Sequence, residues 1–281
     1  MSENPLKQYF RQPVMHLPLP SKGKFYEEGV LDMPPTGELP IYPMTAIDEI
    51  TYKTPDALFN GSAIPSIVKS CVPAFNDPWR MLTFDLNALL VAIRIATYGE
   101  EMDVSSTCPK CNATNTYTIN CHHLLKEDAN IDLYDEPLRF GDLEIYFKPM
   151  TYKDSMDSFQ IGIEEARLEQ LANNDDLTDD QKIEILTEAF KKISTYTLNA
   201  ITASIRSIKT PEAIVTNSEH IQDFLRNCDT KVFEDIKNHL AALKALEDLE
   251  DLKIKCPEDD CGYEYTQPFL IDFATFFEQN S

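Results

Sequence analysis

The stretch CPKCNATNTYT, residues 108–118, has a counterpart near the end of the chain in CPEDDCGYEYT, residues 256–266. Each stretch holds two cysteines a few residues apart, with a proline directly after the first cysteine. Each continues into a Tyr-Thr pair, and both residue types are common in β-strands. The repeated pattern predicts that the two stretches are halves of one site, with the first pair at the tip of a hairpin over residues 102–120.

Two cysteine pairs of this kind suit a four-coordinate metal ion. Zinc prefers four soft ligands in a tetrahedron, and two closely spaced cysteines bind it from one tight turn. Pro109 and Pro257 stiffen the turns, and Gly262 suits a backbone that curls back to donate N–H groups to a thiolate. The predicted ligands of one structural Zn²⁺ ion are Cys108, Cys111, Cys256 and Cys261.

The separation of the two pairs is unusual, because 144 residues lie between them and about 15–20 is the common spacing. A folded insertion with adjacent ends explains it, since the entropy cost of loop closure grows only logarithmically with length. Two alternatives stay open. In one, the pairs pack as small apolar residues without metal. In the other, Cys121, His122 or His123 supplies a ligand, which includes the case of a catalytic metal with an open position.

The composition limits the function classes. A net charge of -22 disfavours binding to nucleic-acid phosphates and to anionic membranes. It favours either a basic protein partner or simple solubility. Seven cysteines, an odd number, argue against a disulfide framework. No apolar run approaches the roughly 18 residues of a membrane span, and the N-terminus lacks the pattern of a signal peptide. We therefore expect a soluble protein that stays in the cytoplasm.

The predicted fold class is α+β. A zinc-ribbon-like small β unit with a core helix is interrupted by an inserted helical domain and preceded by a proline-rich irregular N-terminal region. The predicted bounds are 1–83 for the N-terminal region, 84–150 for the core helix and first ribbon half with its hairpins, 151–250 for the helical domain, and 251–281 for the second ribbon half and tail. The aromatic tail is expected to pack on the core.

Local patterns define the elements inside these regions. Residues 85–98 are apolar at helical spacing nearly all round, which predicts a core helix with Asp85 as its N-cap. Gly141-Asp142 predicts the turn of a second hairpin over 138–150. TDDQ at 178–181 predicts a capping box. The side chains expected to be buried in the helical domain are Phe190, Ile193, Leu198, Phe224, Leu225, Phe233, Ile236 and Leu240.

The N-terminal region is the predicted contact surface. Its dense prolines exclude long helices, and its aromatics are too frequent for a solvated tail. The expected interface anchors are Phe25, Tyr26, Tyr42 and Trp79. No nucleophile motif or glycine-rich phosphate loop is present in a chain with eight glycines, so we expect no enzymatic activity and no catalytic residues.

The order of several motifs resembles the baseplate hub assembly protein family of T4-like tailed bacteriophages. The motifs are LPSKGKFYEEG within 18–29, MTAIDEITYKTPDALFNGSAI at 44–64, CVP at 71–73, and DLNALLVAIRIATYG followed by CPKC. The resemblance covers residues 15–125 and the cysteine pair near 256. It implies a virion-assembly protein that binds other baseplate and hub proteins, in the host cytoplasm during assembly or in the tail baseplate of the virion.

A zinc-ribbon regulatory or nucleic-acid-associated protein is the alternative. Such a protein needs a basic or aromatic stripe beside the ribbon. Here Lys110, Lys253 and Lys255 are outnumbered by acidic neighbours, which are Glu258, Asp259, Asp260 and Glu264.

Overall fold

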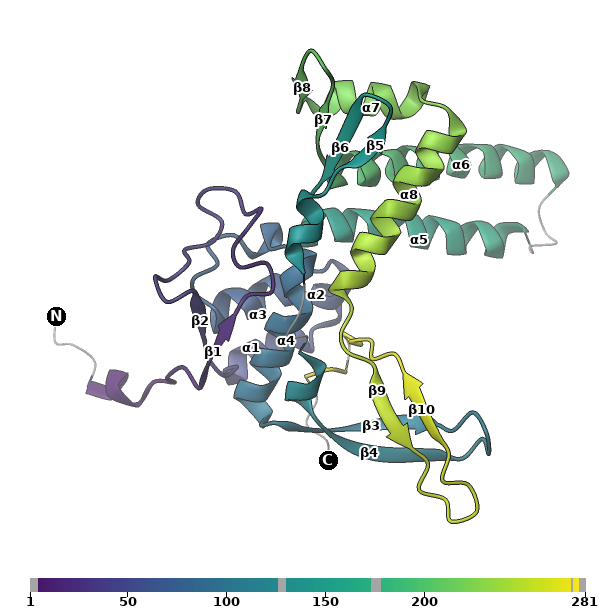
Figure 1. The fold of residues 1–281 in the computed structure, drawn as a ribbon. Coiled ribbons are helices and arrows are strands. Elements are labelled where there is room, and N and C mark those ends of the chain that lie inside the picture. The colour runs from purple at the N-terminus through teal and green to yellow at the C-terminus, as the bar shows by residue number, and fades with distance from the viewer. Residues whose placement is uncertain (1–4, 126–129, 173–177, 274, 278–281) are drawn as a thin grey trace. The chain divides into compact units, whose positions relative to one another are not determined.

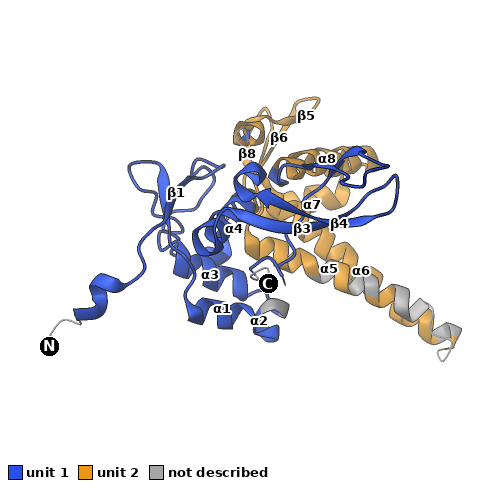
Figure 2. Cartoon of the chain, turned by 90° about the horizontal axis from the view of Figure 1, so that it is seen from below, with its two compact units in different colours: residues 1–81, 85–130, 247–281 blue, residues 82–84, 131–246 orange. Residues whose placement is uncertain are grey.

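The computed structural model describes residues 5–125, 130–172, 178–273 and 275–277. These residues form helices and small antiparallel sheets, so the predicted α+β class is confirmed (Figure 1). The chain divides into two compact units (Figure 2). Unit 1 comprises Met1–Met81, Asp85–Asn130 and Glu247–Ser281, and unit 2 comprises Leu82–Phe84 and Ile131–Leu246. The predicted domain bounds, 1–83, 84–150, 151–250 and 251–281, stay a prediction.

The N-terminal part of unit 1 holds short elements, which agrees with its dense prolines. They are the 3₁₀ turns η1 (Pro5–Tyr9) and η2 (Pro78–Arg80), the strands β1 (Met15–Pro18) and β2 (Glu38–Ile41), and the helices α1 (Ala46–Tyr52), α2 (Pro55–Phe59) and α3 (Ala63–Cys71). β1 and β2 pair antiparallel, with Met15 opposite Ile41. Leu39 and Ile41 are fully buried, so this region contributes to the core of unit 1.

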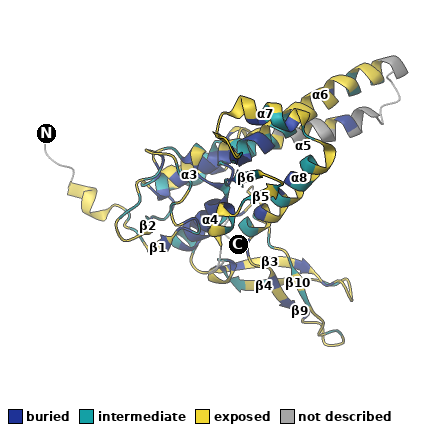
Figure 3. Ribbon diagram, turned by 45° about the horizontal axis from the view of Figure 1, so that its top comes forward, coloured by how far each residue is buried: buried dark blue, intermediate teal, exposed yellow. Residues whose placement is uncertain are grey.

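Helix α4 (Thr83–Tyr98) is the core helix that the sequence predicts (Figure 3). Its residues 89–93 have no exposed surface, because apolar side chains point in every direction from the axis. Gly99 follows the helix with φ of 94°, and its N–H donates to the Ile95 carbonyl at 3.0 Å. The predicted N-cap at Asp85 is wrong. The helix begins at Thr83, so Asp85 lies within its first turn and is fully buried.

Two hairpins of unit 1 carry the cysteine pairs, as predicted. β3 (Glu101–Thr107) pairs antiparallel with β4 (Thr114–Asn120), and β9 (Leu252–Lys255) pairs antiparallel with β10 (Glu264–Gln267). The 3₁₀ turn η3 (Cys121–Leu124) follows β4. The Glu250 N–H donates to the Leu124 carbonyl at 3.4 Å, which joins the segment that enters the second hairpin to the segment that leaves the first.

The C-terminal tail packs on unit 1, which confirms the expectation for its described residues. Phe276 and Phe277 are buried. The Phe277 ring lies edge-on to Tyr52 with ring centroids 5.2 Å apart. The Arg94 Nη1 donates to the Phe276 carbonyl at 2.6 Å, so a buried cation of α4 holds the tail through a backbone contact.

Unit 2 combines a four-stranded antiparallel sheet with helices. The strand order is β5 (Leu138–Phe140), β6 (Leu143–Phe147), β7 (Ile205–Lys209), β8 (Ile214–Val215). Its helices are η4 (Ile131–Asp135), α5 (Tyr152–Ala172), α6 (Asp179–Ser204), α7 (Ser218–Asn227) and α8 (Thr230–Lys244), and η5 (Ala245–Glu247) leads back to unit 1. The hairpin with Gly141 in its turn and the capping box of Thr178 and Gln181 are both confirmed. None of the helices formed by the described residues is long and apolar enough to cross a membrane.

Residues 151–250 were predicted to form only helices, but they contain the strands β7 and β8. β7 begins where α6 ends, because its β-branched residues Ile205 and Ile208 are buried against β6. Of the side chains expected to be buried, Leu225, Ile236 and Leu240 are buried. The half-buried ones are Ile193, Leu198, Phe224 and Phe233. The prediction for Phe190 is wrong, since it is 60% exposed. The spacing of apolar residues identifies the apolar side of a helix, but it does not show whether another element packs against that side.

Candidate metal centre

Each cysteine pair lies in the tight turn between two strands. Cys108 directly follows β3, and Cys256 directly follows β9. The N–H of Cys108 donates to the Ala113 carbonyl at 2.9 Å, and the N–H of Cys256 donates to the Tyr263 carbonyl at 2.9 Å. These bonds extend both ladders past the last paired residues of the strands. In both turns the first cysteine is therefore held at the inner end, where it is buried.

The second cysteine of each pair is followed by a residue in the left-handed region. Asn112 has φ of 58° and Gly262 has φ of 52°. The N–H of Asn112 donates to the Cys108 carbonyl at 2.9 Å, and that of Gly262 donates to the Glu258 carbonyl at 3.2 Å. Glycine was expected at such a position. Asparagine serves the same purpose in the first turn, because it tolerates positive φ better than most residues.

The four predicted ligands lie together. Their sulfur atoms are all within 4.8 Å of one another. The closest measured pairs join the two hairpins, with 3.8 Å between the sulfurs of Cys108 and Cys261 and 3.6 Å between those of Cys111 and Cys256. A tetrahedral zinc ion with Zn–S bonds of about 2.3 Å separates its sulfurs by about 3.8 Å. A disulfide needs about 2.05 Å. The spacing thus fits four ligands around one ion and does not fit disulfides.

Backbone N–H groups point at the sulfurs and affect their ionisation. Burial opposes the charged form of Cys108, but N–H donors of Cys111 and Lys110 outweigh it and lower the pKa of its thiol to about 7. The N–H of Glu258 lowers the pKa of Cys256, but burial and the three neighbouring thiols together raise it to about 12. Four adjacent thiols cannot all ionise on their own. A divalent cation removes this conflict because it neutralises the thiolates.

The hairpins also touch beyond the sulfurs. The Ser106 and Tyr265 hydroxyls lie 2.8 Å apart, and the Ser106 hydroxyl donates to the Gln267 side chain. The Lys110 Nζ lies 5.8 Å from the centroid of the Tyr263 ring. Contacts between β3 and β10 therefore align the two turns that hold the cysteines.

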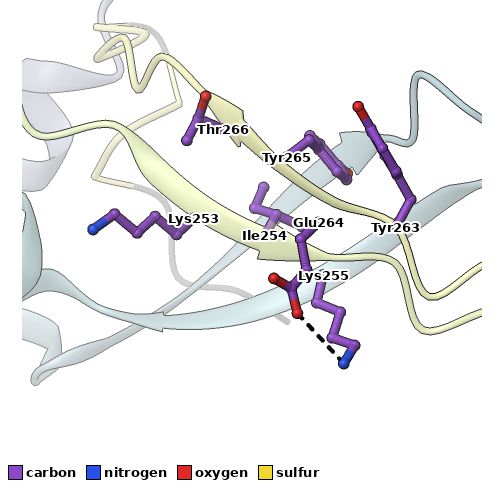
Figure 4. Close-up of a pocket in the computed structure, with 7 residues that line it drawn as sticks. All are labelled: Lys253, Ile254, Lys255, Tyr263, Glu264, Tyr265 and Thr266. Atoms are coloured by element: carbon purple, nitrogen blue, oxygen red, sulfur yellow. Dashed lines mark ion pairs between the residues drawn. The ribbon is translucent and has the colours of Figure 1, made fainter.

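Residues of the second hairpin line an open pocket of about 730 Å³. Figure 4 shows its lining residues, with Lys253 and Lys255 on β9, Tyr263 directly before β10 and Glu264 as the first residue of β10. The Lys255 Nζ and a Glu264 carboxylate oxygen lie 3.5 Å apart, so one of the two lysines has an acidic neighbour.

The other candidate ligands lie outside the cluster. The metal-type grouping found among the described residues contains neither Cys121 nor the adjacent His122 and His123. Cys121 is buried, and burial raises the pKa of its thiol despite a nearby Arg94 guanidinium. His122 is exposed, with its Nε2 3.6 Å from a Glu100 carboxylate oxygen.

One polar site has no local signal in the sequence. Asp85 accepts hydrogen bonds from the Ser21 N–H at 2.8 Å, the Ser21 hydroxyl at 2.6 Å and the Tyr26 hydroxyl at 2.8 Å. Burial raises the pKa of Asp85 to about 6 although these donors oppose the shift. The network ties the loop that contains Ser21 to the core helix. Periodicity cannot reveal it, because 64 residues separate Asp85 from Ser21.

Taken together, the elements describe an α+β protein in which two hairpins, distant in sequence, bring four cysteines to one point. The chain belongs to the family of T4 bacteriophage base plate proteins, whose model matches residues 42–278. The comparisons with curated proteins and with solved structures gave no match. The predicted resemblance to a T4-type baseplate family is confirmed, and the narrower assignment to hub assembly stays a prediction. Membership implies a structural role in the phage base plate, interaction with other phage proteins and association with the virion tail.

Proposed function

We propose that the protein is a hub protein of the phage tail baseplate, or a factor that assembles the hub, and that it acts by binding other proteins. It does so in the host cytoplasm during assembly and stays in the tail baseplate if it is a hub component. The family match over residues 42–278 carries the baseplate part of the proposal. The hub part rests on the N-terminal motifs, of which residues 44–64 and 71–73 lie inside the matched range.

The proposal includes a structural Zn²⁺ ion bound by Cys108, Cys111, Cys256 and Cys261. The sulfur separations of 3.6 and 3.8 Å support it. Four protein thiolates complete the tetrahedron and leave no position for water, so the ion has a structural role and no catalytic one. The hairpins are short, and a metal ion supplies the stability that so small a β unit cannot obtain from its own core.

The N-terminal region is the proposed contact surface for other baseplate proteins. All four expected anchors are half-buried. Tyr26 donates to Asp85, and Tyr42 lies under the Arg11 guanidinium with 5.9 Å between the guanidinium carbon and the ring centroid. These two aromatics support the fold of their own chain. Phe25 and Trp79 are the other two expected anchors, and their substitution tests binding.

Co-expression of the tagged full-length chain with the other tail proteins of its source tests the proposal. We expect a hub protein to co-purify with it, and Phe25→Ala with Trp79→Ala to reduce the amount recovered. Ile214→Ser on β8 is the matched control, since Ile214 is 66% exposed and belongs to unit 2. Deletion of the whole N-terminal region is unsuitable because it removes buried Leu39 and Ile41. Absence of any co-purifying tail protein contradicts the proposal.

A nucleic-acid-associated ribbon is the second candidate. The rings of Tyr263 and Tyr265 stack with centroids 6.2 Å apart, close to Lys110, and such aromatic and basic groups bind single strands elsewhere. The net charge of -22 and the Lys255–Glu264 pair oppose it. Fluorescence anisotropy with labelled single-stranded DNA at low salt separates the two candidates, and we expect no binding.

A further inference from the structure

The four clustered cysteines can be grouped into two pairs that each join the two hairpins. The sulfurs of Cys108 and Cys261 lie 3.8 Å apart, and those of Cys111 and Cys256 lie 3.6 Å apart. Each of these cross-hairpin pairs takes one cysteine from the turn after β3 and one from the turn after β9. A disulfide bond needs its sulfurs about 2.05 Å apart, so each pair must close by less than about 2 Å. Such a step lies within the reach of a side-chain rotation.

Each cross-hairpin pair combines a more accessible cysteine with a buried one. Cys111 is exposed and Cys261 is half-buried, whereas their partners Cys256 and Cys108 are buried. A small oxidant therefore reaches one thiolate of each pair first, and the buried partner lies directly behind it. An accessible cysteine beside a resolving cysteine is the arrangement in which oxidation leads to a disulfide.

Other contacts align the two hairpins without a metal ion (Figure 1). The Ser106 hydroxyl on β3 lies 2.8 Å from the Tyr265 hydroxyl and donates to the Gln267 side chain, and both partners are on β10. The Glu250 N–H donates to the Leu124 carbonyl at 3.4 Å, just before the second hairpin begins. These contacts keep the two turns side by side, so the sulfurs of each cross-hairpin pair stay adjacent while the first disulfide forms.

We propose that the four-cysteine site is a redox switch. A peroxide oxidises it to two disulfides, Cys108–Cys261 and Cys111–Cys256, and the metal ion is released. The inference rests on the proposed structural zinc ion. Zinc binds thiolates, and a disulfide sulfur is no longer a thiolate, so each new bond removes two ligands. The two disulfides then replace the ion as the link between the hairpins.

Each disulfide forms in two steps that consume one peroxide molecule. The accessible thiolate attacks a peroxide oxygen, the O–O bond breaks, and the departing hydroxide takes up a proton to become water. The buried thiolate then attacks the sulfur of the resulting sulfenic acid, the S–O bond breaks, and a second hydroxide leaves and becomes water. Two electrons pass from the sulfurs to the peroxide. Two peroxide molecules therefore oxidise the four thiolates and free one Zn²⁺ ion.

A tail protein encounters both redox conditions. Family membership associates the chain with the virion tail. In the proposed function the chain is made in the reducing cytoplasm of the host, where thiolates persist and can bind zinc. A hub component then leaves with the virion and enters an oxidising environment, in which disulfides persist. The metal ion is thus the stable link before release, and the disulfides are the stable link afterwards.

Titration of the full-length protein with hydrogen peroxide tests the switch. A metal-sensitive dye measures the released zinc, and mass spectrometry of non-reduced peptides identifies the disulfides after free thiols have been alkylated. Lys110 lies between the first two cysteines of the site and Asp259 between the other two. Digestion with trypsin and endoproteinase Asp-N therefore puts each of the four cysteines in a separate peptide. We expect all of the bound zinc to be released.

The linked peptides decide the pairing. We expect links that join Cys108 to Cys261 and Cys111 to Cys256. Links within one hairpin, the opposite combination across the hairpins, or zinc release without any disulfide overturn the inference. Cys228→Ser is the matched control, since Cys228 lies outside the cluster and its substitution should change neither the zinc release nor the links. Dithiothreitol followed by zinc should restore the original state.

Hydrogen exchange tests whether the disulfides hold the hairpins together. A chelator should speed amide exchange in β3 and β9 of the reduced protein by about tenfold or more, because the metal link is lost. The oxidised protein should keep its protection in the same chelator, and equal loss in both forms contradicts the replacement of one link by the other. Elemental analysis before oxidation tests the zinc ion separately. Zinc-free protein that forms both links contradicts only the zinc ion, whereas zinc-loaded protein with other links contradicts only the switch.

Discussion

Cys108 and Cys261 lie 153 residues apart in the sequence, and their sulfur atoms lie 3.8 Å apart. The contact joins the tips of two hairpins that have no strand pairing with each other. The first cysteine of each pair is buried, whereas Cys111 is exposed and Cys261 is half-buried, so burial alone does not account for all four positions. The spacing of the four sulfur atoms is compatible with one shared metal ion.

The first prediction concerns metal content. Freshly purified protein should contain one zinc ion per chain by elemental analysis, and Cys256→Ser should lose it. Structural zinc in small fingers has an apparent binding free energy of about 10–16 kcal/mol, so its loss should unfold the hairpin tips. Cys228→Ser is the control, since Cys228 lies in unit 2 outside the cluster. Wild-type protein without zinc contradicts the prediction.

The second prediction concerns the left-handed residues after Cys111 and Cys261. Asn112→Gly should preserve zinc binding, because glycine adopts positive φ without strain. Asn112→Val should lower the free energy of unfolding by about 1–2 kcal/mol, since a β-branched residue is strained there. Elemental analysis measures the zinc bound by each variant, and chemical denaturation of the zinc-loaded protein measures its free energy of unfolding. Equal stability of the two variants contradicts this account of the turn.

The sequence was informative where the signal is local. Cysteine spacing and flanking prolines indicated both turns, and the apolar pattern around Leu89 indicated a core helix. Sequence-based prediction failed for side chains whose contacts come from residues far away in the sequence. Asp85 fits an N-cap by local rules, yet its carboxylate is used by Ser21, 64 residues away. Phe190 lies on an apolar helix side that the described chain leaves exposed. β7 was missed because five residues of strand follow a long helix directly.

The third prediction concerns the pH dependence that Asp85 creates. Its pKa is about 6 in the folded protein against an ordinary value of 3.8, so folding favours the protonated form. The stability that protonation contributes is fully present below about pH 4 and is lost as the pH rises through 6. The loss is about 3 kcal/mol by linkage. Asp85→Asn should abolish this component.

Urea denaturation at several pH values measures it as the difference between wild type and Asp85→Asn. The subtraction removes the titration of other carboxylates that the two proteins share. A difference that does not change between pH 4 and pH 7 contradicts the burial of an ionisable group at this position.

The fourth prediction concerns autonomous folding of the inserted segment. A fragment of residues 131–246 should unfold cooperatively on heating. A fragment of residues 151–250 should be less stable, because it lacks β5 and β6 and leaves buried Ile205 and Ile208 of β7 without their paired strand. Circular dichroism and concentration-dependent light scattering distinguish the two. Equal stability contradicts a role for the sheet.

The split arrangement of the cysteines has a consequence for synthesis. The ribosome adds roughly 5–20 residues per second, so the second cysteine pair emerges roughly 7–30 s after the first. During this interval Cys108 and Cys111 offer two ligands instead of four, while the 144 intervening residues emerge progressively and can begin to fold. A metal ion that needs all four thiolates is therefore bound only after the whole segment between the two cysteine pairs has been made.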